Sequence, residues 1–401
     1  GTLSMFPTEL SHDVFSLIPE QDRLALVCKM QISPEGKVAS SEFFSAIIQS
    51  KHKLNYDQVS EELTESPNIA IEDKLDPNIL ELLQTLHKVA KLRYFYRSQH
   101  CIVQQDNVDY MYKLDKQGHI ESVSTRTPTI AHKIVEEAML ATNCCAGHLL
   151  VKKLLAEKNL AEFSIAPLFT THTGFKPERI NEIEQLLKKD FPDVTYNNLS
   201  ELDGYIGLIK SLSNTENGST IVSTFRRLLR PAELSNEPKS HFGLGFEHYA
   251  MVTSPIRRYQ DLVNHRAIKS IISNKTENKT TTPQNIEPKN LQESIGNIRQ
   301  ASRQLDQWLL CEFLSHHINS EFTAKVAAVS NQGLAVRLLE NGAESFIQMK
   351  NTKEKPAKYD SIRMTLTYDE NIYRIDQEIS VKLSKVDLGN RQITLALIER
   401  K

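Results

Sequence analysis

The sequence predicts a mixed α+β domain followed by a small all-β barrel. Strand-length apolar runs alternate with helical periodicity before about residue 320, and only short strand-like runs follow it. With 401 residues and 45.6 kDa, the chain is long enough for two or three compact units. Its 40% hydrophobic and 24% charged residues are typical of a globular protein.

The first part of the chain contains two strand-length runs and then a helix signal. Leu24–Ile32 and Glu42–Ser50 are short and apolar, which indicates strands. Asp76 followed by Pro77 is the pattern of a helix N-cap with proline in the first turn. Apolar residues at helical spacing then predict a helix that continues to about Arg93.

A hairpin and two further helices are expected before residue 190. The segments Val108–Leu114 and His119–Ser124 flank Asp-Lys-Gln-Gly, a turn sequence that favours a β-hairpin. Ile130–Leu155 has the pattern of a long, mostly buried helix, and Pro177–Lys189 that of an amphipathic surface helix.

The segment Ser273–Asn290 is the strongest candidate for a solvated loop. It has no aromatic residue and almost no apolar side chain, so it cannot bury enough surface to offset the entropy cost of ordering. Because helix-like sequence stands on both sides, the loop need not separate domains.

The last 80 or so residues change in character. Five or six short runs with polar or glycine-containing breaks predict a closed β-barrel of the OB type, which often binds single-stranded nucleic acid. A purely structural β-domain explains the strand pattern equally well. The expected strands are Phe322–Val329, Leu334–Leu339, Glu344–Gln348, Ser361–Thr367, Ile379–Val386 and Gln392–Leu397.

Composition limits the class and location of the protein. No run approaches the ~18 apolar residues of a membrane-spanning helix, so we expect no membrane association. The first residues lack a signal peptide, and the five cysteines form no C-x-x-C pair, which favours a reducing, cytoplasmic location. The chain also has no initiator Met and is expected to be part of a longer protein. Its net charge of −2 says nothing about partners.

Positive charge is concentrated in Lys210–Ser270, which carries nine basic and five acidic residues. Arginine predominates there, and its planar guanidinium suits bidentate contacts with phosphate. The alternative is a solvated basic surface, the usual outcome for a cluster of charges.

Within this segment, Thr253-Ser254-Pro255 is interpreted as a turn that starts a helix, where hydroxyls and free backbone N–H groups form an anion site. Arg257 and Arg258 would then lie in the first turn, unfavourably placed against the helix dipole unless an anion is bound. Asp261 and His265 would be one turn apart; such a pair can bind metal, but is more often structural.

The run HFGLGFEHYAMVTSPIRRYQDLVNHRAI at 241–268 closely resembles the signature of the RNase II (RNB) family of processive 3′→5′ exoribonucleases. MFPTELSHDVFSLIP near the start, IIQSKHKLNYDQVS at 47–60, IVEEAMLATNCCA at 134–146 and the OB-like end resemble the same family in the same order. The resemblance implies a partial, N-terminally truncated α+β RNB-type catalytic domain over 1–319 and an RNA-binding OB-fold barrel over 320–401.

The family's hydrolytic metals are held by an aspartate-rich motif that would lie upstream of Gly1. Magnesium requires hard carboxylate oxygens, and this sequence has no comparable cluster of aspartates. The family's N-terminal OB domains are also missing. We therefore expect Mg²⁺ to be the cofactor of the parent protein, no metal ligands in this chain, and no RNase activity of the chain alone.

The resemblance also implies roles for individual residues. Arg257 is expected to be catalytic, holding the scissile or 3′-terminal phosphate. Tyr249, Thr253, Ser254 and Arg258 are expected to contact RNA, with Arg258 also pairing with a carboxylate. Arg337 and Arg391 of the barrel are expected to follow the RNA backbone.

Three further positions bear on how RNA is gripped. Glu136 matches the family's VEE carboxylate, implied to contact ribose; the alternative is a buried carboxylate paired with an arginine. Gln104 stands where bacterial relatives carry a base-stacking aromatic ring, and Ser302 where they carry an acid. In the barrel, Leu334 and Val336 follow Gly333 in place of aromatic residues, so base stacking there is in doubt.

The leading hypothesis is part of a monomeric exoribonuclease that releases nucleoside 5′-monophosphates from single-stranded RNA. The second is a non-catalytic RNA-binding protein on a degenerate exonuclease domain. A third, an OB-fold translation protein with an unrelated N-terminal part, is disfavoured by the TSPIRRY match. Clustered aspartates upstream in the reading frame would favour the first, and a start codon at the boundary the second.

Overall fold

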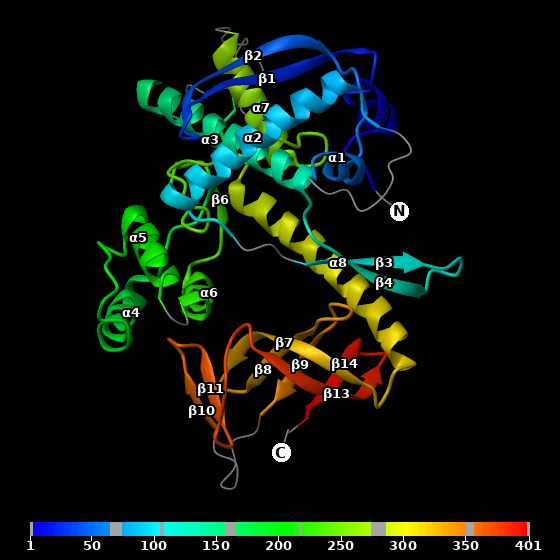
Figure 1. Ribbon diagram of the computed structural model, residues 1–401, viewed down its shortest axis with the longest axis vertical. Coiled ribbons are helices and arrows are strands. Elements are labelled where there is room, and N and C mark those ends of the chain that lie inside the picture. Colours follow the sequence, from blue (N-terminus) through cyan, green and yellow to red (C-terminus); the bar gives the residue numbers. More distant parts are fainter. Residues whose placement is uncertain are drawn as a thin grey trace. The chain divides into compact units, whose positions relative to one another are not determined.

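The computed structural model describes residues 3–64, 74–104, 108–157, 165–215, 218–273, 286–349 and 357–398. They form two compact units whose segments alternate along the chain (Figure 1). Unit 1 comprises residues 1–105, 128–173 and 231–292, and unit 2 comprises residues 106–127, 174–230 and 293–401.

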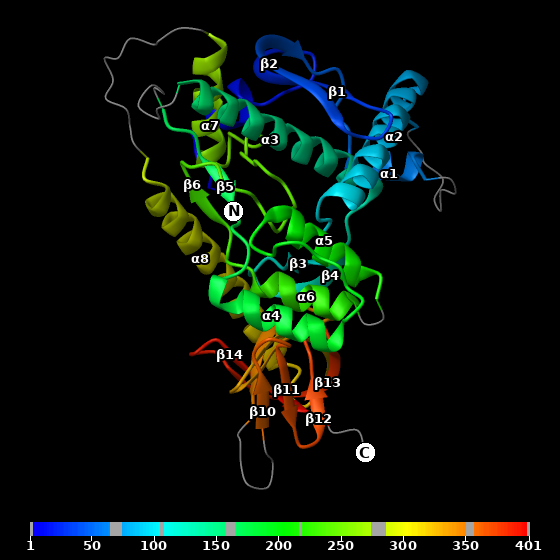
Figure 2. The same cartoon turned by 90° about the vertical axis from the view of Figure 1, so that its left-hand side faces the viewer.

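Unit 1 contains a long antiparallel hairpin of β1 (Asp22–Ile32) and β2 (Val38–Gln49), close to the two predicted strands. A short π-helix, Leu10–Val14, precedes it. The hairpin lies beside α2, α3 and α7 in both views (Figures 1 and 2). Leu26, Cys28 and Met30 alternate along β1 and pack against the core that α3 and α7 share.

Three helices of unit 1 follow the hairpin in sequence: α1 (Tyr56–Glu62), α2 (Pro77–His100) and α3 (Ile130–Glu157). The predicted cap of α2 is confirmed, since the Asp76 carboxylate accepts from the Asn78 backbone N–H at 2.8 Å. The predicted end near Arg93 is wrong by about two turns. Arg93 and Arg97 are buried, and the contacts of their guanidinium groups keep the helix ordered to His100.

Helix α3 is long and apolar enough to cross a membrane, judged by length and composition alone. The prediction that the chain has no helix of this kind was therefore too strict, because only uninterrupted apolar runs were counted in the sequence. Ala141, Ala146 and Leu150 of this helix are almost fully buried in unit 1. A core helix passes the same test of length and composition.

The rest of unit 1 is built from two short strands, β5 (Phe169–Thr171) and β6 (Glu233–Ser235), and helix α7 (Tyr259–Ile272). The two strands pair antiparallel. The segment around Tyr249 lies beside β5, since the Thr170 N–H donates to the Tyr249 carbonyl at 2.9 Å. Gly147 lets α3 approach this segment, since a Cβ there would lie 2.9 Å from the His248 carbonyl carbon.

Unit 2 contains three helices grouped together in Figure 2: α4 (Pro177–Asp190), α5 (Leu202–Ser213) and α6 (Gly218–Leu228). The predicted amphipathic helix is thus confirmed as α4. Phe175 packs edge-on against Tyr205 and Phe225, both of them fully buried.

The second part of unit 2 is a nearly closed five-stranded barrel in the order β14-β13-β7-β8-β9. The Ser345 hydroxyl on β9 donates to the Ile393 carbonyl on β14 at 2.6 Å and draws the two edges together. Helix α8 (Pro288–Ser315) contributes Leu310, Cys311 and Leu314 to the barrel core. The strands are β7 (Glu321–Ser330), β8 (Gly333–Leu338), β9 (Glu344–Gln348), β13 (Glu378–Asp387) and β14 (Gln392–Leu397).

The predicted hairpin is confirmed as β3 (Asp109–Leu114) and β4 (Ile120–Arg126), with Gly118 at φ +92° in its turn. It packs against the barrel. The Tyr110 hydroxyl donates to the Leu338 carbonyl at 3.3 Å, and Ile120 is buried in the barrel core.

One strand prediction and the end of one predicted loop differ from the structure. Instead of one strand at Ser361–Thr367, the structure has β10 (Ala357–Asp360), a turn, β11 (Thr365–Tyr368) and β12 (Asn371–Tyr373). The Asp360 carboxylate accepts from the Ile362 and Arg363 backbone N–H groups, which forms the turn. Of the predicted loop Ser273–Asn290, residues 274–285 lie outside the described residues, and Pro288–Asn290 already belong to α8.

Candidate functional site

The candidate site is the TSPIRR loop, residues 253–258, which precedes α7. Helix α7 begins only at Tyr259, and Arg258 is its N-cap residue with extended backbone angles (φ −130°, ψ 115°). The backbone N–H groups of Arg257 and Arg258 both donate to the Ser254 carbonyl, at 3.2 and 3.0 Å, in a tight turn. The predicted position of both arginines in the first helical turn is therefore wrong, and the argument from the helix dipole no longer applies.

Asp261 ties the loop back to the first turn of α7. Its Oδ2 accepts from the Ser254 backbone N–H at 2.8 Å and lies 2.9 Å from Arg258 Nη2. Arg258 Nη2 also donates to the Thr253 hydroxyl at 3.1 Å. Burial raises the pKa of Asp261, and the Arg258 guanidinium opposes this shift. The expected pairing of Arg258 with a carboxylate is confirmed.

His265 holds the strand that enters the loop. Its Nε2 lies 2.7 Å from the Val252 carbonyl, so the ring donates through that nitrogen. Burial lowers the pKa of His265, which favours the neutral ring. Asp261 and His265 therefore brace successive parts of the same loop, consistent with the structural interpretation of this pair.

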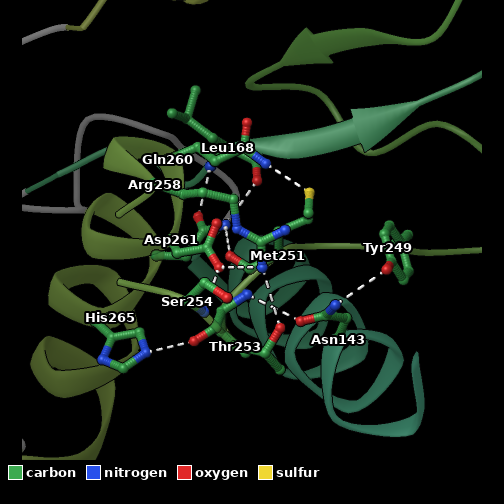
Figure 3. Close-up of polar contacts among 12 residues, drawn as sticks. Asn143, Leu168, Tyr249, Met251, Thr253, Ser254, Arg258, Gln260, Asp261 and His265 are labelled. Atoms are coloured by element: carbon green, nitrogen blue, oxygen red, sulfur yellow. Dashed lines mark hydrogen bonds and ion pairs between the residues drawn. The ribbon is translucent and has the colours of Figure 1, made fainter. Parts of the chain in front are cut away.

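Two buried asparagines that the sequence analysis missed, Asn143 and Asn264, complete the bracing, and Figure 3 shows the contacts of Asn143. Asn143 of α3 accepts from the Val252 N–H through Oδ1 at 2.9 Å and donates to the Tyr249 hydroxyl at 3.0 Å. Asn264 of α7 donates to the Leu168 and Met251 carbonyls and accepts from the Leu168 N–H, at 2.9, 2.9 and 2.8 Å. Their amides link α3, α7 and the segment after Pro167 to the loop.

Tyr249 is buried, with 6% of its surface exposed. Its ring stacks on Phe246, with ring centres 5.7 Å apart, and its hydroxyl receives the Asn143 hydrogen bond. Burial raises the pKa of Tyr249 to about 12. In this conformation Tyr249 supports the loop from the core, whereas Thr253 and Ser254 are half-buried.

The HFGLG turn, residues 241–245, lies beside this core in unit 1. The Gly243 N–H donates to His172 Nδ1 at 3.0 Å, and the Leu244 N–H to His241 Nδ1 at 3.2 Å. Gly245 has φ +70°, and a Cβ there would lie 2.5 Å from the Ile102 nitrogen. The exposed Gln104 donates to the Gly243 carbonyl at 3.2 Å, which places it at this turn.

Glu136 is exposed on α3, with its carboxylate 3.3 Å from Lys133 Nζ. The buried carboxylate paired with arginine, the alternative considered for Glu136, is its neighbour Glu137. Glu137 Oε2 accepts from Arg97 Nε at 3.0 Å, and both side chains are less than 5% exposed. The Glu136 carboxylate thus remains accessible to a ligand.

Arg257 differs from the polar residues around it. Its side chain is exposed, and no hydrogen bond or ion pair joins its guanidinium to any residue that the structure describes. Its backbone is nevertheless fixed by the turn to Ser254. A guanidinium without internal partners, on a backbone held in a tight turn, can bind a phosphate group without first breaking an internal contact.

The predicted RNA-contacting residues of the barrel lie in unit 2. Arg337 is exposed on β8 and pairs with Glu344 on β9. Arg391 is exposed in the turn before β14, at φ +54°. Leu334 and Val336 are buried in the barrel core, so these aliphatic side chains do not face solvent. The aromatic Phe346 on β9 is 48% exposed. Ser302 is exposed on α8.

Among the residues that the structure describes, no group of three or more His, Cys, Asp or Glu side chains could hold a metal ion. Asp261, the acid nearest the loop, is engaged by Arg258 and Ser254. The described part of the chain therefore does not fit a catalytic Mg²⁺ site, and no chemical step is assigned to a metal here.

The comparisons with known proteins agree with this architecture. The RNB domain family matches residues 1–274, and the S1 RNA binding domain matches residues 315–398. The second match covers the β7–β14 barrel, and the first includes the TSPIRR loop. The chain belongs to the RNB domain family, which confirms the resemblance seen in the sequence.

Among curated relatives, Exoribonuclease 2 of Xenorhabdus bovienii is 33% identical over 98% of this chain, which covers 59% of that protein. The chain thus spans about three fifths of the length of such relatives. Among solved structures, Mycoplasma genitalium RNase R in complex with ribose-methylated single-stranded RNA is similar to this chain, with a TM-score of 0.79 and 21% sequence identity. The match covers 98% of this chain and 61% of the RNase R chain. Yeast Ssd1, described as a pseudonuclease, is similar with a TM-score of 0.58 and 17% sequence identity. That match covers 91% of this chain and 44% of the Ssd1 chain.

Proposed function

We propose that the protein of which this chain forms part is a 3′→5′ exoribonuclease that hydrolyses single-stranded RNA to nucleoside 5′-monophosphates. The observation that carries the proposal is the exposed, uncommitted Arg257 guanidinium on a loop that buried side chains hold in place. Relatives that are 33% identical and named Exoribonuclease 2 support the same reaction.

In this proposal Arg257 binds the scissile or 3′-terminal phosphate and stabilises the charge that grows on its oxygens in the transition state. Asp261, Asn143, Asn264 and His265 act indirectly by fixing the loop, so that little reorganisation accompanies the reaction. Magnesium, with ligands outside the described residues, belongs to the proposal for the parent protein. A monomeric, cytoplasmic enzyme remains an expectation from the sequence.

The alternative is a non-catalytic RNA-binding protein. The fold alone permits it, because RNase R and a pseudonuclease both share this architecture. Binding and catalysis predict different effects of changing Arg257: in a binder the change weakens RNA affinity, whereas loss of transition-state stabilisation lowers kcat.

The decisive test uses the parent protein with Arg257→Ala, Arg257→Lys and the control Arg266→Ala. Arg266 is exposed on α7 and lies nine residues after Arg257 in the sequence. Its replacement by alanine removes the same charge as Arg257→Ala. We expect both Arg257 variants to lower kcat ~10²–10³-fold with little change in RNA affinity, and the control to change kcat by less than about threefold. Loss of affinity at an unchanged kcat, or full activity of Arg257→Lys, would reject the catalytic role.

The 401-residue chain alone tests the binding part of the proposal. We expect it to bind single-stranded RNA without degrading it, and the affinity to fall steeply as salt rises because phosphate contacts release counterions. Fluorescence anisotropy with a labelled oligonucleotide at two salt concentrations measures this. Equal affinity at both would argue against phosphate contacts, and EDTA-sensitive degradation by nuclease-free protein would contradict the expected inactivity.

A further inference from the structure

Arg257 and Arg258 are neighbours in the TSPIRR loop, but their side chains are placed differently. The Arg257 side chain is exposed. The Arg258 side chain is only 23% exposed, and its Nη2 contacts the Thr253 hydroxyl at 3.1 Å and Asp261 Oδ2 at 2.9 Å (Figure 3). Arg258 Nε is shielded from solvent and has no hydrogen-bond partner among the described residues. The Arg258 guanidinium is thus engaged within the loop.

Asp261 fixes the orientation of this guanidinium. The Asp261 side chain is fully buried, and its Oδ2 also accepts from the Ser254 backbone N–H at 2.8 Å. The Arg258 backbone N–H donates to the Ser254 carbonyl at 3.0 Å, so the main chain and the side chain of Arg258 are both held. An arginine paired with a buried carboxylate keeps its N–H groups in fixed directions.

The contact with Arg258 determines what the Thr253 hydroxyl can do. A guanidinium has only donors, so Thr253 Oγ1 is the acceptor in this hydrogen bond, and its single proton must point away from Arg258. Within the described part of the chain, the Thr253 hydroxyl donates to no acceptor. The residue is half-buried, so a ligand can reach it. The hydroxyl is therefore left as a donor, which the charge of Arg258 strengthens by polarising the O–H bond.

We propose that Arg258 is a positioning residue, which orients the Thr253 hydroxyl so that it donates to a phosphate oxygen of the RNA. This inference rests on the proposed function, which supplies the RNA. Arg257 belongs to the same turn, since its backbone N–H donates to the Ser254 carbonyl at 3.2 Å. A phosphate group has several acceptor oxygens, enough to accept from a guanidinium and a hydroxyl at once. Arg258 itself does not touch the RNA in this assignment.

RNA binding by the 401-residue chain tests the hydroxyl with Thr253→Val, Thr253→Ser and the control Thr85→Val. Valine keeps the shape of threonine without the hydroxyl, and serine keeps the hydroxyl. Thr85 is exposed on α2, where its hydroxyl donates to the Glu81 carbonyl. We expect Thr253→Val to weaken the affinity about 10- to 100-fold, as for one lost hydrogen bond to a charged group, and the other two variants to change it less than about threefold.

The dependence of affinity on salt separates a donor from a merely structural residue. Losing one phosphate-binding charge lowers the slope of log affinity against log salt by ~0.7 for a single strand. Thr253→Val removes no charge, so we expect lower affinity at every salt concentration and an unchanged slope, whereas Arg257→Ala should lower the slope. A slope that falls by ~0.7 in Thr253→Val would mean that Arg257 is displaced, and would overturn the donor role.

Arg258 is tested with the double variant Arg258→Gln/Asp261→Asn, which leaves no buried charge unpaired. We expect weaker binding at an unchanged slope, and no further loss when Thr253→Val is added, because both changes remove the same donor. A slope lowered by ~0.7, or losses that add, would mean that Arg258 meets RNA itself and would overturn the positioning role. The Thr253 variants keep the ion pair and test the donor even if the double variant does not fold.

The wild-type chain distinguishes failure of this inference from failure of the proposed function. If the wild-type chain binds no single-stranded RNA, the proposed function is contradicted and this assignment falls with it. If the wild type binds and a folded Thr253→Val binds equally well, or if Thr253→Ser loses as much affinity as Thr253→Val, only the assignment of Thr253 and Arg258 is overturned.

Discussion

Replacement of Asn264 by alanine should weaken unit 1 more than most single substitutions do. Asn264 is fully buried, and its carboxamide makes three hydrogen bonds of 2.8–2.9 Å. Two join it to both backbone groups of Leu168, and the third to the carbonyl of Met251 at the entrance to the TSPIRR loop. Alanine cannot replace any of them.

The expected loss follows from what the substitution leaves behind. The Leu168 N–H, in a residue that is 1% exposed, loses its acceptor, which costs ~1–3 kcal/mol for an unsatisfied buried donor. Two carbonyls each lose one donor at ~0.5–1.5 kcal/mol. Together these terms predict a loss of about 2–6 kcal/mol in the free energy of unfolding.

Urea unfolding of Asn264→Ala, with amide hydrogen exchange at Leu168, measures the effect. The matched control is Asn236→Ala, since Asn236 is half-buried and makes a single hydrogen bond, to the neighbouring Pro167 carbonyl at 2.9 Å. The control should lose only about 1 kcal/mol. If both variants lose the same amount, or if Leu168 exchange is unchanged in Asn264→Ala, Asn264 does not brace the loop as inferred.

Two further predictions concern buried ionisable groups of unit 1. Burial lowers the pKa of His241 from 6.5 to about 4. As the pH falls, His241 is therefore protonated in the unfolded chain before it is protonated in the folded protein, so the free energy of unfolding should fall by up to ~3 kcal/mol between pH ~6.5 and ~4. His241→Asn should flatten this dependence in urea midpoints measured across that range, and an unchanged slope would contradict it. Glu137→Gln should lower the free energy of unfolding by about 3–5 kcal/mol, because it leaves the Arg97 charge buried and unpaired. The control Glu136→Gln, at an exposed position, should lower it by less than ~0.5 kcal/mol. Equal losses for the two variants would refute the buried-pair argument.

Periodicity and local turn chemistry predicted the elements whose signals are contained in their own residues. Strands β1 and β2, the Asp76 cap of α2 and helix α3 were found this way, as were most strands of the barrel. The three-residue strands β5 and β6 are too short to show a period. The turn at Asp360 was missed because a single side chain interrupts an otherwise strand-like run.

The site was predicted less well than the fold because its support comes from distant residues. The sequence drew attention to the TSPIRR loop, but Asn143 lies 109 residues from its partner Val252, and Asn264 lies 96 from Leu168. A lone asparagine on a helix carries no local sign of such contacts. The start of α7 was misplaced because Asp261 reaches back to the Ser254 N–H, which keeps the preceding residues in a turn.

The bracing of the loop and the freedom of Arg257 bear differently on catalysis. Asp261, Asn143 and Asn264 satisfy buried backbone groups, so any protein with this fold gains from them whether or not it cleaves RNA. The Arg257 side chain is exposed, and no hydrogen bond or ion pair joins its guanidinium to the part of the chain described. An exposed arginine without such contacts adds little to folding stability, which is why we propose a ligand-binding role for Arg257. The Arg257→Lys variant is for that reason more informative than any change to the residues that support the loop.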